Sequence, residues 1–124
     1  LGAIYLCQAK NCIVWDNICA DGAVKNYNSS TTYKLDYCCT TPAVPSGHGA
    51  NNIAESPCFR MTGDHPYSLS VASRCRDAGS NALYANEFTG NELDFAGQPR
   101  VFHKTIDIGC YESQSLSGTF ILVR

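Results

Sequence analysis

Short runs of β-branched and aromatic residues, separated by clusters of Gly, Asn, Asp, Ser and Pro, fill most of the 124-residue chain. This alternation is typical of short strands joined by turns, and the 3.6-residue periodicity of helices is nearly absent. The chain must therefore bury many small strand faces. We predict strands at 3–7, 12–15, 32–38, 67–71, 99–102, 105–108 and 119–123, loops at 26–30 and 41–52, and at most one helical turn within 81–91.

Signals for tight hairpins are weak. The best are Asp21-Gly22 and Thr62-Gly63-Asp64, and neither lies between two clean alternating runs. An up-and-down sandwich of similar length needs more such turns. A solenoid does not need them, because each strand pairs in parallel with its equivalent one coil away.

Charge and hydropathy exclude two classes of partner. The formal net charge is −2, so the chain has no basic footprint for nucleic acid. Its longest apolar run, 120–123, is far shorter than the roughly 20 residues of a membrane-spanning helix. The length allows one domain. The chain opens on Leu1 with no signal peptide, so we expect a processed or excised product.

Cysteine is abundant and even in number. Eight cysteines in a chain of this size predict a disulfide framework, and therefore an oxidising, secreted or cell-surface location. A metal site is the alternative, but there is no Cys-x-x-Cys pair and no His at ligand spacing from a cysteine pair. We expect no metal and no cofactor. The disulfide candidates are Cys7, Cys12, Cys19, Cys38, Cys39, Cys58, Cys75 and Cys110.

Three motifs follow one another in the C-terminal half. They are Cys-x-Asp-Ala-Gly at 75–79, Leu-Asp-x-Ala-Gly-x-Pro-Arg at 93–100 and Asp-Ile-Gly-x-Tyr-Glu at 107–112. In this order they resemble the C-terminal end of bacterial surface and secreted proteins that fold as right-handed parallel β-helices, the pectate-lyase-like solenoids. Further segments that resemble parts of those proteins are 11–17, 37–42 and 49–59, with departures from the family pattern at Ser56, Arg74, Arg76 and Cys110.

The resemblance implies an all-β fold. Residues 1–112 are expected to form a right-handed parallel β-helix of about five rungs, at roughly 20 to 25 residues per coil, with disulfide staples. Residues 113–124 are expected to be a polar spacer followed by an apolar strand. The family likeness points to a scaffold rather than to an active site.

The cysteines suit such a solenoid. Equivalent positions of adjacent rungs lie about 4.8 Å apart, within the 4.4–6.8 Å that a disulfide requires between Cα atoms. Cys12 and Cys39 lie in rung-like segments, and we predict that they are neighbours in one column. Cys38 and Cys39 are adjacent, so strand alternation sends their side chains to opposite faces. Eight cysteines allow 105 connectivities, and Cys110 fits a free thiol and a disulfide equally well.

A group of charged residues in the C-terminal motifs invites two interpretations. Carboxylates could serve glycoside hydrolysis, or lyase chemistry with an arginine and calcium. Alternatively they fasten the last rungs through charge-assisted hydrogen bonds. We expect the structural role and no catalytic residue, because in related solenoid lyases the catalytic groups project from central rungs. The residues are Asp77, Asp94, Arg100, Asp107 and Glu112.

Aromatic residues and histidines supply the remaining candidates. Trp15, Tyr33 and Tyr37 could form a surface that stacks on sugar rings, or they could fill the solenoid core. The histidines, His48, His65 and His103, lie in loop-like contexts, and we expect them to be solvated.

The two ends suggest assembly. The first residues resemble the middle of a rung, and the apolar tail is expected to fold back or to pair with another molecule by strand addition. We therefore expect a non-catalytic extracellular structural module that forms a homo-oligomer or polymer, or that continues a missing N-terminal β-helix. The alternative is a polysaccharide-binding or polysaccharide-cleaving terminal fragment. The assembly candidates are Leu1, Ile4, Phe120, Ile121, Leu122 and Val123.

Overall fold

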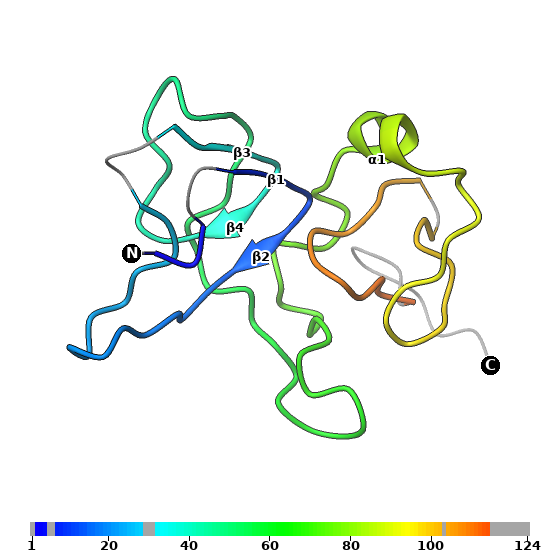
Figure 1. Cartoon of the computed structure of the whole chain (residues 1–124). Helices are drawn as coiled ribbons and strands as arrows, with labels where there is room; N and C mark the ends of the chain where they lie inside the picture. The colour runs from blue at the N-terminus through cyan, green and yellow to red at the C-terminus, as the bar shows by residue number, and fades with distance from the viewer. Residues whose placement is uncertain (1, 5–6, 29–31, 103, 115–124) are drawn as a thin grey trace.

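A computed structural model describes residues 2–4, 7–28, 32–102 and 104–114. Its regular elements are few and short (Figure 1). They are β1 (Gln8–Lys10), β2 (Ile13–Val14), β3 (Lys34–Asp36), β4 (Cys39–Thr40) and α1 (Asn81–Glu87).

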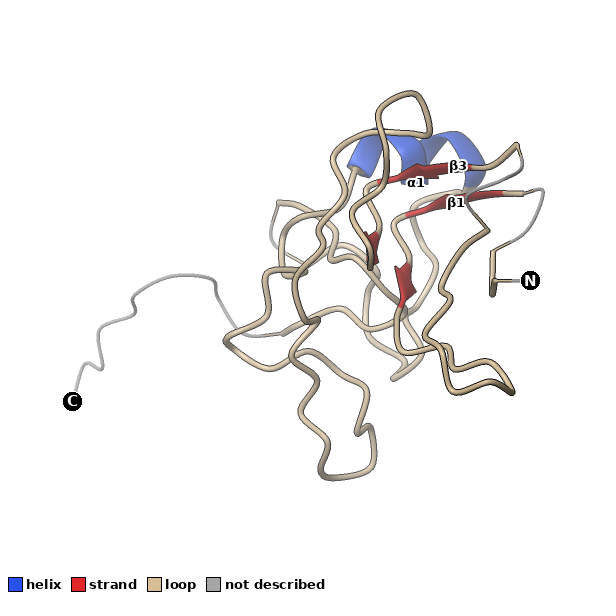
Figure 2. Cartoon of the chain, turned by 90° about the vertical axis from the view of Figure 1, so that its left-hand side faces the viewer, coloured by secondary structure: helices blue, strands red, loops and turns tan. Residues whose placement is uncertain are grey.

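The strands pair in parallel across a constant shift. β1 pairs with β3 in the register Gln8↔Lys34, and β2 pairs with β4 in the register Ile13↔Cys39, so both pairs share a shift of 26 residues. β1 and β3 lie side by side in Figure 2. The chain thus passes the same place twice in the same direction, as a solenoid does.

A third pass continues the stack on the far side of β3 and β4. The N–H of Leu35 donates to the carbonyl of His48 at 2.8 Å, and the N–H of Tyr37 donates to that of Ala50 at 3.0 Å. Ile53 forms a parallel bridge with Cys39. The order of passes is therefore first, second, third, and we call this stack of 7–14, 34–40 and 48–53 the ladder.

The three passes turn the same corner. Asn11, Tyr37 and Asn51 have φ values of 52°, 54° and 60°. The register stacks them, because Asn11 lies one shift before Tyr37 and the Ile53–Cys39 bridge places Asn51 beside Tyr37. A left-handed residue redirects a strand sharply, so this column bends all three passes together.

The ladder separates two small hydrophobic cores. On one face Leu35 and Cys38 are fully buried with Ala9, Tyr27 and Tyr33. On the other face Cys39, Leu69, Cys75 and Ile108 form the second core, with Ile13, Ile53 and Phe59 packed against it. Cys38 and Cys39 therefore face opposite sides, as strand alternation predicts.

The C-terminal half has a different construction. Its bridges, Phe59↔Leu69 and Leu93↔Pro99, are antiparallel. Helix α1 lies beside the ladder in Figure 1. The Ser80 side chain caps it by accepting from the N–H of Leu83 at 3.2 Å, and Asn11 exchanges two hydrogen bonds with the Ser80 backbone at 2.7 and 3.0 Å. The helix is thereby anchored to the first corner.

The predicted strands agree only in part. β2 and β3 lie inside the predicted 12–15 and 32–38, but β1 follows the predicted 3–7. Among residues 3, 4 and 7, which the structure describes, Ile4 forms a single bridge, to Tyr27. Single bridges replace the strands predicted at 67–71 and 99–102, and 105–108 is not a strand, because Asp107 is held by hydrogen bonds outside any ladder. The predicted turn within 81–91 is helix α1, and the strand predicted at 119–123 lies outside the described residues.

The short strands and the single helix do not test the whole of the predicted fold. Two small parallel pairs and one short helix are present among the described residues. The right-handed β-helix of about five rungs stays a prediction. No helix in the described ranges is long and apolar enough to cross a membrane.

Candidate functional site

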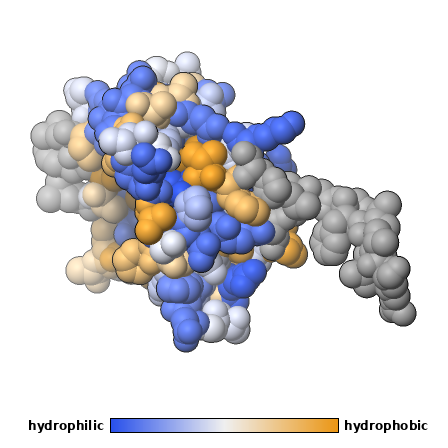
Figure 3. Space-filling model, turned by 90° about the vertical axis from the view of Figure 1, so that its right-hand side faces the viewer, coloured by the Kyte–Doolittle hydropathy of each residue, from blue (hydrophilic) through white to orange (hydrophobic). Residues whose placement is uncertain are grey.

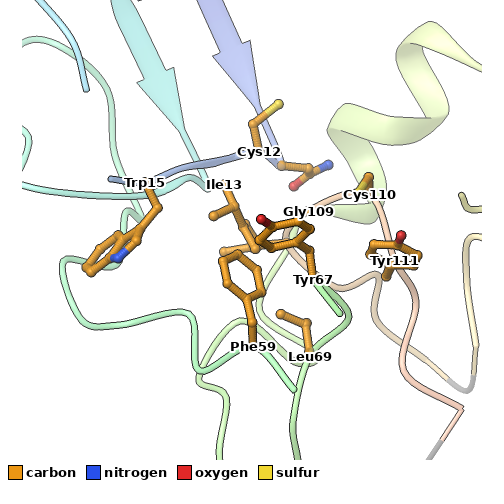
Figure 4. Close-up of a pocket in the computed structure, with 11 residues that line it drawn as sticks. Cys12, Ile13, Trp15, Phe59, Tyr67, Leu69, Gly109, Cys110 and Tyr111 are labelled. Carbon is orange, nitrogen blue, oxygen red and sulfur yellow. The ribbon is translucent and has the colours of Figure 1, made fainter. Parts of the chain in front are cut away.

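An aromatic groove of about 530 Å³ lies between the ladder and the C-terminal half. Figure 4 shows Phe59, Tyr67 and Leu69 gathered beneath Ile13, with Trp15 at one end and Tyr111 at the other. We call this the aromatic groove. Its lining residues are Asn11, Cys12, Ile13, Trp15, Phe59, Tyr67, Leu69, Ile108, Gly109, Cys110 and Tyr111.

Local structure places each ring. Trp15 directly follows β2 and packs against the second core. Phe59 and Leu69 are brought together by their antiparallel bridge, and the ring of Tyr67 meets Phe59 edge-on with centroids 5.5 Å apart. Tyr67 is 60% exposed, so the groove offers open aromatic surface to solvent.

Tyr111 joins the aromatic groove to a polar hollow. Its ring meets Phe95 edge-on at 5.7 Å, and its hydroxyl lies 3.4 Å from His65 Nδ1. The hollow has a volume of about 370 Å³ and includes Arg60, Asp64 and Gln98 in its lining. A ligand with an apolar face and hydroxyl groups could therefore contact both parts.

A further apolar hollow of about 490 Å³ lies under α1. Three large apolar side chains in this region, Phe88, Leu93 and Phe95, are 55%, 62% and 75% exposed. Figure 3 shows apolar atoms interrupting the polar surface on the face that carries the C-terminal half. The ring of Tyr84 stacks on Phe88 with centroids 5.2 Å apart, which ties the helix end to this hollow.

Three predicted acidic residues form one buried network. Asp94, Asp107 and Glu112 are 8%, 1% and 5% exposed. All six carboxylate oxygens accept backbone N–H groups. The donors are Ala96, Gln98 and Glu112 to Asp94, Asp77 and Ser113 to Asp107, and Phe102 and Asp107 to Glu112.

Arg100 forms an ion pair with this network. Its Nη1 lies 3.7 Å from Glu112 Oε2, and its Nη2 donates to the carbonyl of Asp107 at 3.5 Å. Asp77 is exposed and contributes its backbone N–H to Asp107 at 2.7 Å. The structure thus brings together all five predicted residues, and their arrangement ties the C-terminal loops to one another.

Burial controls the protonation of these carboxyls. It raises the pKa of Glu112 to about 7, outweighing the backbone N–H groups and Arg100, which favour the charged form. Burial also raises the pKa of Asp107. By contrast, hydrogen bonds from Thr89 and Tyr84 lower the pKa of the half-buried Glu92 to about 2.

The predicted stacking aromatics do not form one surface. Trp15 lines the aromatic groove, but Tyr33 is only 4% exposed and lies in the first core between Tyr27 and His48. Tyr37 occupies the second corner of the ladder. The groove instead recruits Phe59, Tyr67 and Tyr111, which sequence analysis missed because they come from distant loops.

The histidines also differ from expectation. His48 is half-buried and stacks on Tyr33 with centroids 4.3 Å apart, so it is not simply solvated. His65 is exposed and contacts Tyr111. His103 lies outside the described residues.

All eight cysteines are thiols in this structure. The predicted pairing of Cys12 with Cys39 is wrong by one position, because the shift of 26 places Cys12 beside Cys38 and Ile13 beside Cys39. Cys39 instead packs with Cys75 in the second core. Cys7 and Cys110 are exposed, and Cys19 and Cys58 are partly buried.

The predicted assembly residues are mostly outside the described ranges. Leu1 and 120–123 are not described. Ile4 bridges Tyr27 and packs against the first core, so its side chain serves the fold. Among the described residues, no group of three or more His, Cys, Asp or Glu side chains could hold a metal ion.

Comparisons of the chain with protein-family models, curated proteins and solved structures found no match.

Proposed function

We propose that this protein is a non-catalytic structural module of an extracellular or cell-surface assembly, in which the ladder of one copy continues the ladder of the next. The observation that carries the proposal is the open edge of β1. Within the described residues β1 has β3 as its strand partner on one side only. An unpaired strand edge is a template for another strand.

Hydrogen bonding identifies the groups on that edge. The N–H of Lys34 donates to the carbonyl of Cys7, and the N–H of Asn11 donates to that of Asp36, both at 3.2 Å. Residues 7, 9 and 11 therefore bond toward β3, and alternation turns the N–H and C=O groups of Gln8 and Lys10 the other way. Gln8 is exposed, so its backbone groups are accessible.

The opposite end of the ladder is the complementary surface. The third pass, 48–53, lies on the far side of β3 and β4, so the two ends of the ladder differ. A contact between unlike ends is heterologous and builds an open filament unless it closes into a ring. The structural use of Asp94, Asp107 and Glu112 favours a scaffold over an enzyme, because their oxygens are occupied by backbone donors.

Replacing Gln8 by proline is expected to abolish assembly and leave the fold intact. Proline lacks the N–H that would bond to the next copy, and it is tolerated on edge strands. The native protein should form regular fibres by electron microscopy and a large mass by light scattering. Gln8→Pro should give a 13.4 kDa monomer.

Gln8→Ala is the matched control, since it changes the side chain and keeps the N–H. It should assemble like the native protein. A native protein that remains monomeric at high concentration would contradict the proposal, as would fibres of Gln8→Pro. Truncation after residue 114 should preserve fibres, because stacking of the ladder does not use the tail.

A second candidate function, polysaccharide binding, is favoured by the aromatic groove. Open aromatic rings beside a polar hollow suit a sugar, which presents apolar ring faces and hydroxyl groups. Trp15 is the only tryptophan, so its fluorescence reports on this groove.

Titration with oligogalacturonides or neutral glucan oligosaccharides should then quench Trp15. Tyr67→Ala should weaken binding about tenfold by removing the most open ring face. Met61→Ala provides the control, because Met61 is 65% exposed and does not line the groove. No quenching with either series would remove this candidate and leave the structural proposal untouched.

A further inference from the structure

Two pairs of cysteines lie on the two faces of the ladder. The shift of 26 residues between the first and second passes places Cys12 opposite Cys38. Next to this position, the N–H of Cys39 donates to the carbonyl of Cys12 at 2.9 Å. Cys38 is fully buried in the first core, and Cys12 packs against that core. Equivalent positions of parallel strands lie about 4.8 Å apart, within the Cα separation of disulfides.

The thiols of the first pair both lie against carbonyls of the first pass. The Sγ of Cys38 lies 3.4 Å from the carbonyl of Ala9, and the Sγ of Cys12 lies 2.9 Å from that of Lys10. The interaction with Cys38 lowers the pKa of Cys12 to about 6, and the same interaction raises the pKa of Cys38. Cys12 is thus the thiol that ionises first and attacks an oxidant.

The second pair lies in the other core. Cys39 and Cys75 are both fully buried and belong to one cluster. The Sγ of Cys39 donates to the carbonyl of Glu55 at 3.2 Å, and the interaction between the two thiols raises the pKa of Cys39 and lowers that of Cys75. The backbone of Cys75 is held by the N–H of Ile108, which donates to its carbonyl at 2.9 Å.

We propose that these pairs are oxidised to two disulfides, Cys12–Cys38 and Cys39–Cys75. The first joins the first and second passes of the ladder, and the second joins the ladder to the C-terminal half. The adjacent residues Cys38 and Cys39 then carry both bonds, one on each face. This proposal does not rest on the proposed assembly.

A low-molecular-weight disulfide such as oxidised glutathione is the oxidant. The Cys12 thiolate attacks one sulfur, an S–S bond to glutathione forms, and one glutathione thiolate leaves. The Cys38 thiol loses its proton and displaces the second glutathione thiolate. Each pair of protein thiols, on becoming a disulfide, thus gives two electrons and two protons to one oxidised glutathione, which becomes two reduced molecules.

The two disulfides differ in how easily a reagent in solution reaches them. Cys12 is only partly buried, so a reagent can reach the first pair in the folded protein. Cys39 and Cys75 are 0% exposed, so their bond must form as the chain folds and should resist reductant afterwards. In native protein, dithiothreitol should therefore release Cys12 and Cys38 first, and Cys39 and Cys75 only after denaturant is added.

Peptide mapping tests the pairing. The protein is refolded in oxidised and reduced glutathione, alkylated and cut with trypsin, in a variant with Cys19→Ser and Cys58→Ser. Peptides 11–25, 35–60 and 75–76 then carry only the four proposed cysteines. They should appear as one linked species. Protein that has been fully reduced in denaturant and then refolded with dithiothreitol should melt at least about 10 °C below the oxidised protein.

Two serine variants separate the vicinal cysteines. Cys38→Ser should free peptide 11–25 and keep 75–76 attached to 35–60, whereas Cys39→Ser should do the reverse. If a variant fails to fold, tandem mass spectrometry of the linked species between Cys38 and Cys39 gives the same assignment. Crossed linkage, with Cys12 on Cys39 or Cys75 on Cys38, overturns the proposal. So does alkylation of all four as thiols after oxidative refolding.

Discussion

Replacing Gly49 by alanine is expected to lower the free energy of unfolding by at least about 3 kcal/mol. Gly49 lies in the third pass with φ +121°, and an added Cβ would lie 1.8 Å from the carbonyl oxygen of Leu35. This neighbour is backbone of β3 and cannot move aside as a side-chain tip can. Because Leu35 also donates to His48 at 2.8 Å, relieving the clash would pull the second and third passes apart.

Gly47→Ala is the matched control for this prediction. Gly47 lies in the same loop with φ +91°, but an added Cβ would meet nothing within 4 Å. It should lose only about 1 kcal/mol, from the left-handed conformation alone. Urea unfolding of both variants under the same redox conditions measures the difference. Equal losses would show that the close approach of Gly49 to β3 does not stabilise the ladder.

Local sequence signals predicted local features of this fold. The β-branched and aromatic runs placed β2 and β3, and the segment at 81–91 contains α1. The register of the ladder could not be predicted, because it depends on a corner that all three passes share. Asparagine tolerates the left-handed conformation at two of these positions, but Tyr37 gives no such signal. The one-residue error in pairing Cys12 follows from this.

The candidate site was predictable to a similar extent. Asp94, Asp107 and Glu112 could be grouped because carboxylates beside glycine turns commonly accept backbone N–H groups. The aromatic groove could not, since only long-range packing brings Trp15, Phe59, Tyr67 and Tyr111 into one lining. In the sequence, an aromatic residue whose ring is buried in a core looks the same as one whose ring lines a groove. Tyr33, a candidate for the sugar-stacking surface, is buried in the structure.

Stability is expected to rise as the pH falls from about 7 to 4.5, because of Glu112. Its pKa is about 7 in the folded protein and 4.5 when unfolded. Between these values the folded state holds a proton that the unfolded state has lost, so raising the pH favours unfolding. The full span is worth about 3 kcal/mol. Asp107, whose pKa burial also raises, acts in the same direction.

Glu112→Gln should remove most of this dependence, because glutamine does not ionise. Urea unfolding at pH 4.5, 6 and 7.5 gives the difference between native protein and variant, in which the contribution from Cys12 cancels. Glu92→Gln is the control, because hydrogen bonds lower the pKa of Glu92 to about 2. The ionised Glu92 therefore stabilises the folded protein above pH 4.5, and this contribution is lost only as the pH falls from 4.5 toward 2. The control should keep the slope between pH 4.5 and 7. Parallel curves for Glu112→Gln and the native protein would mean that Glu112 stays ionised when buried, with Arg100 and the backbone N–H groups outweighing the loss of solvent.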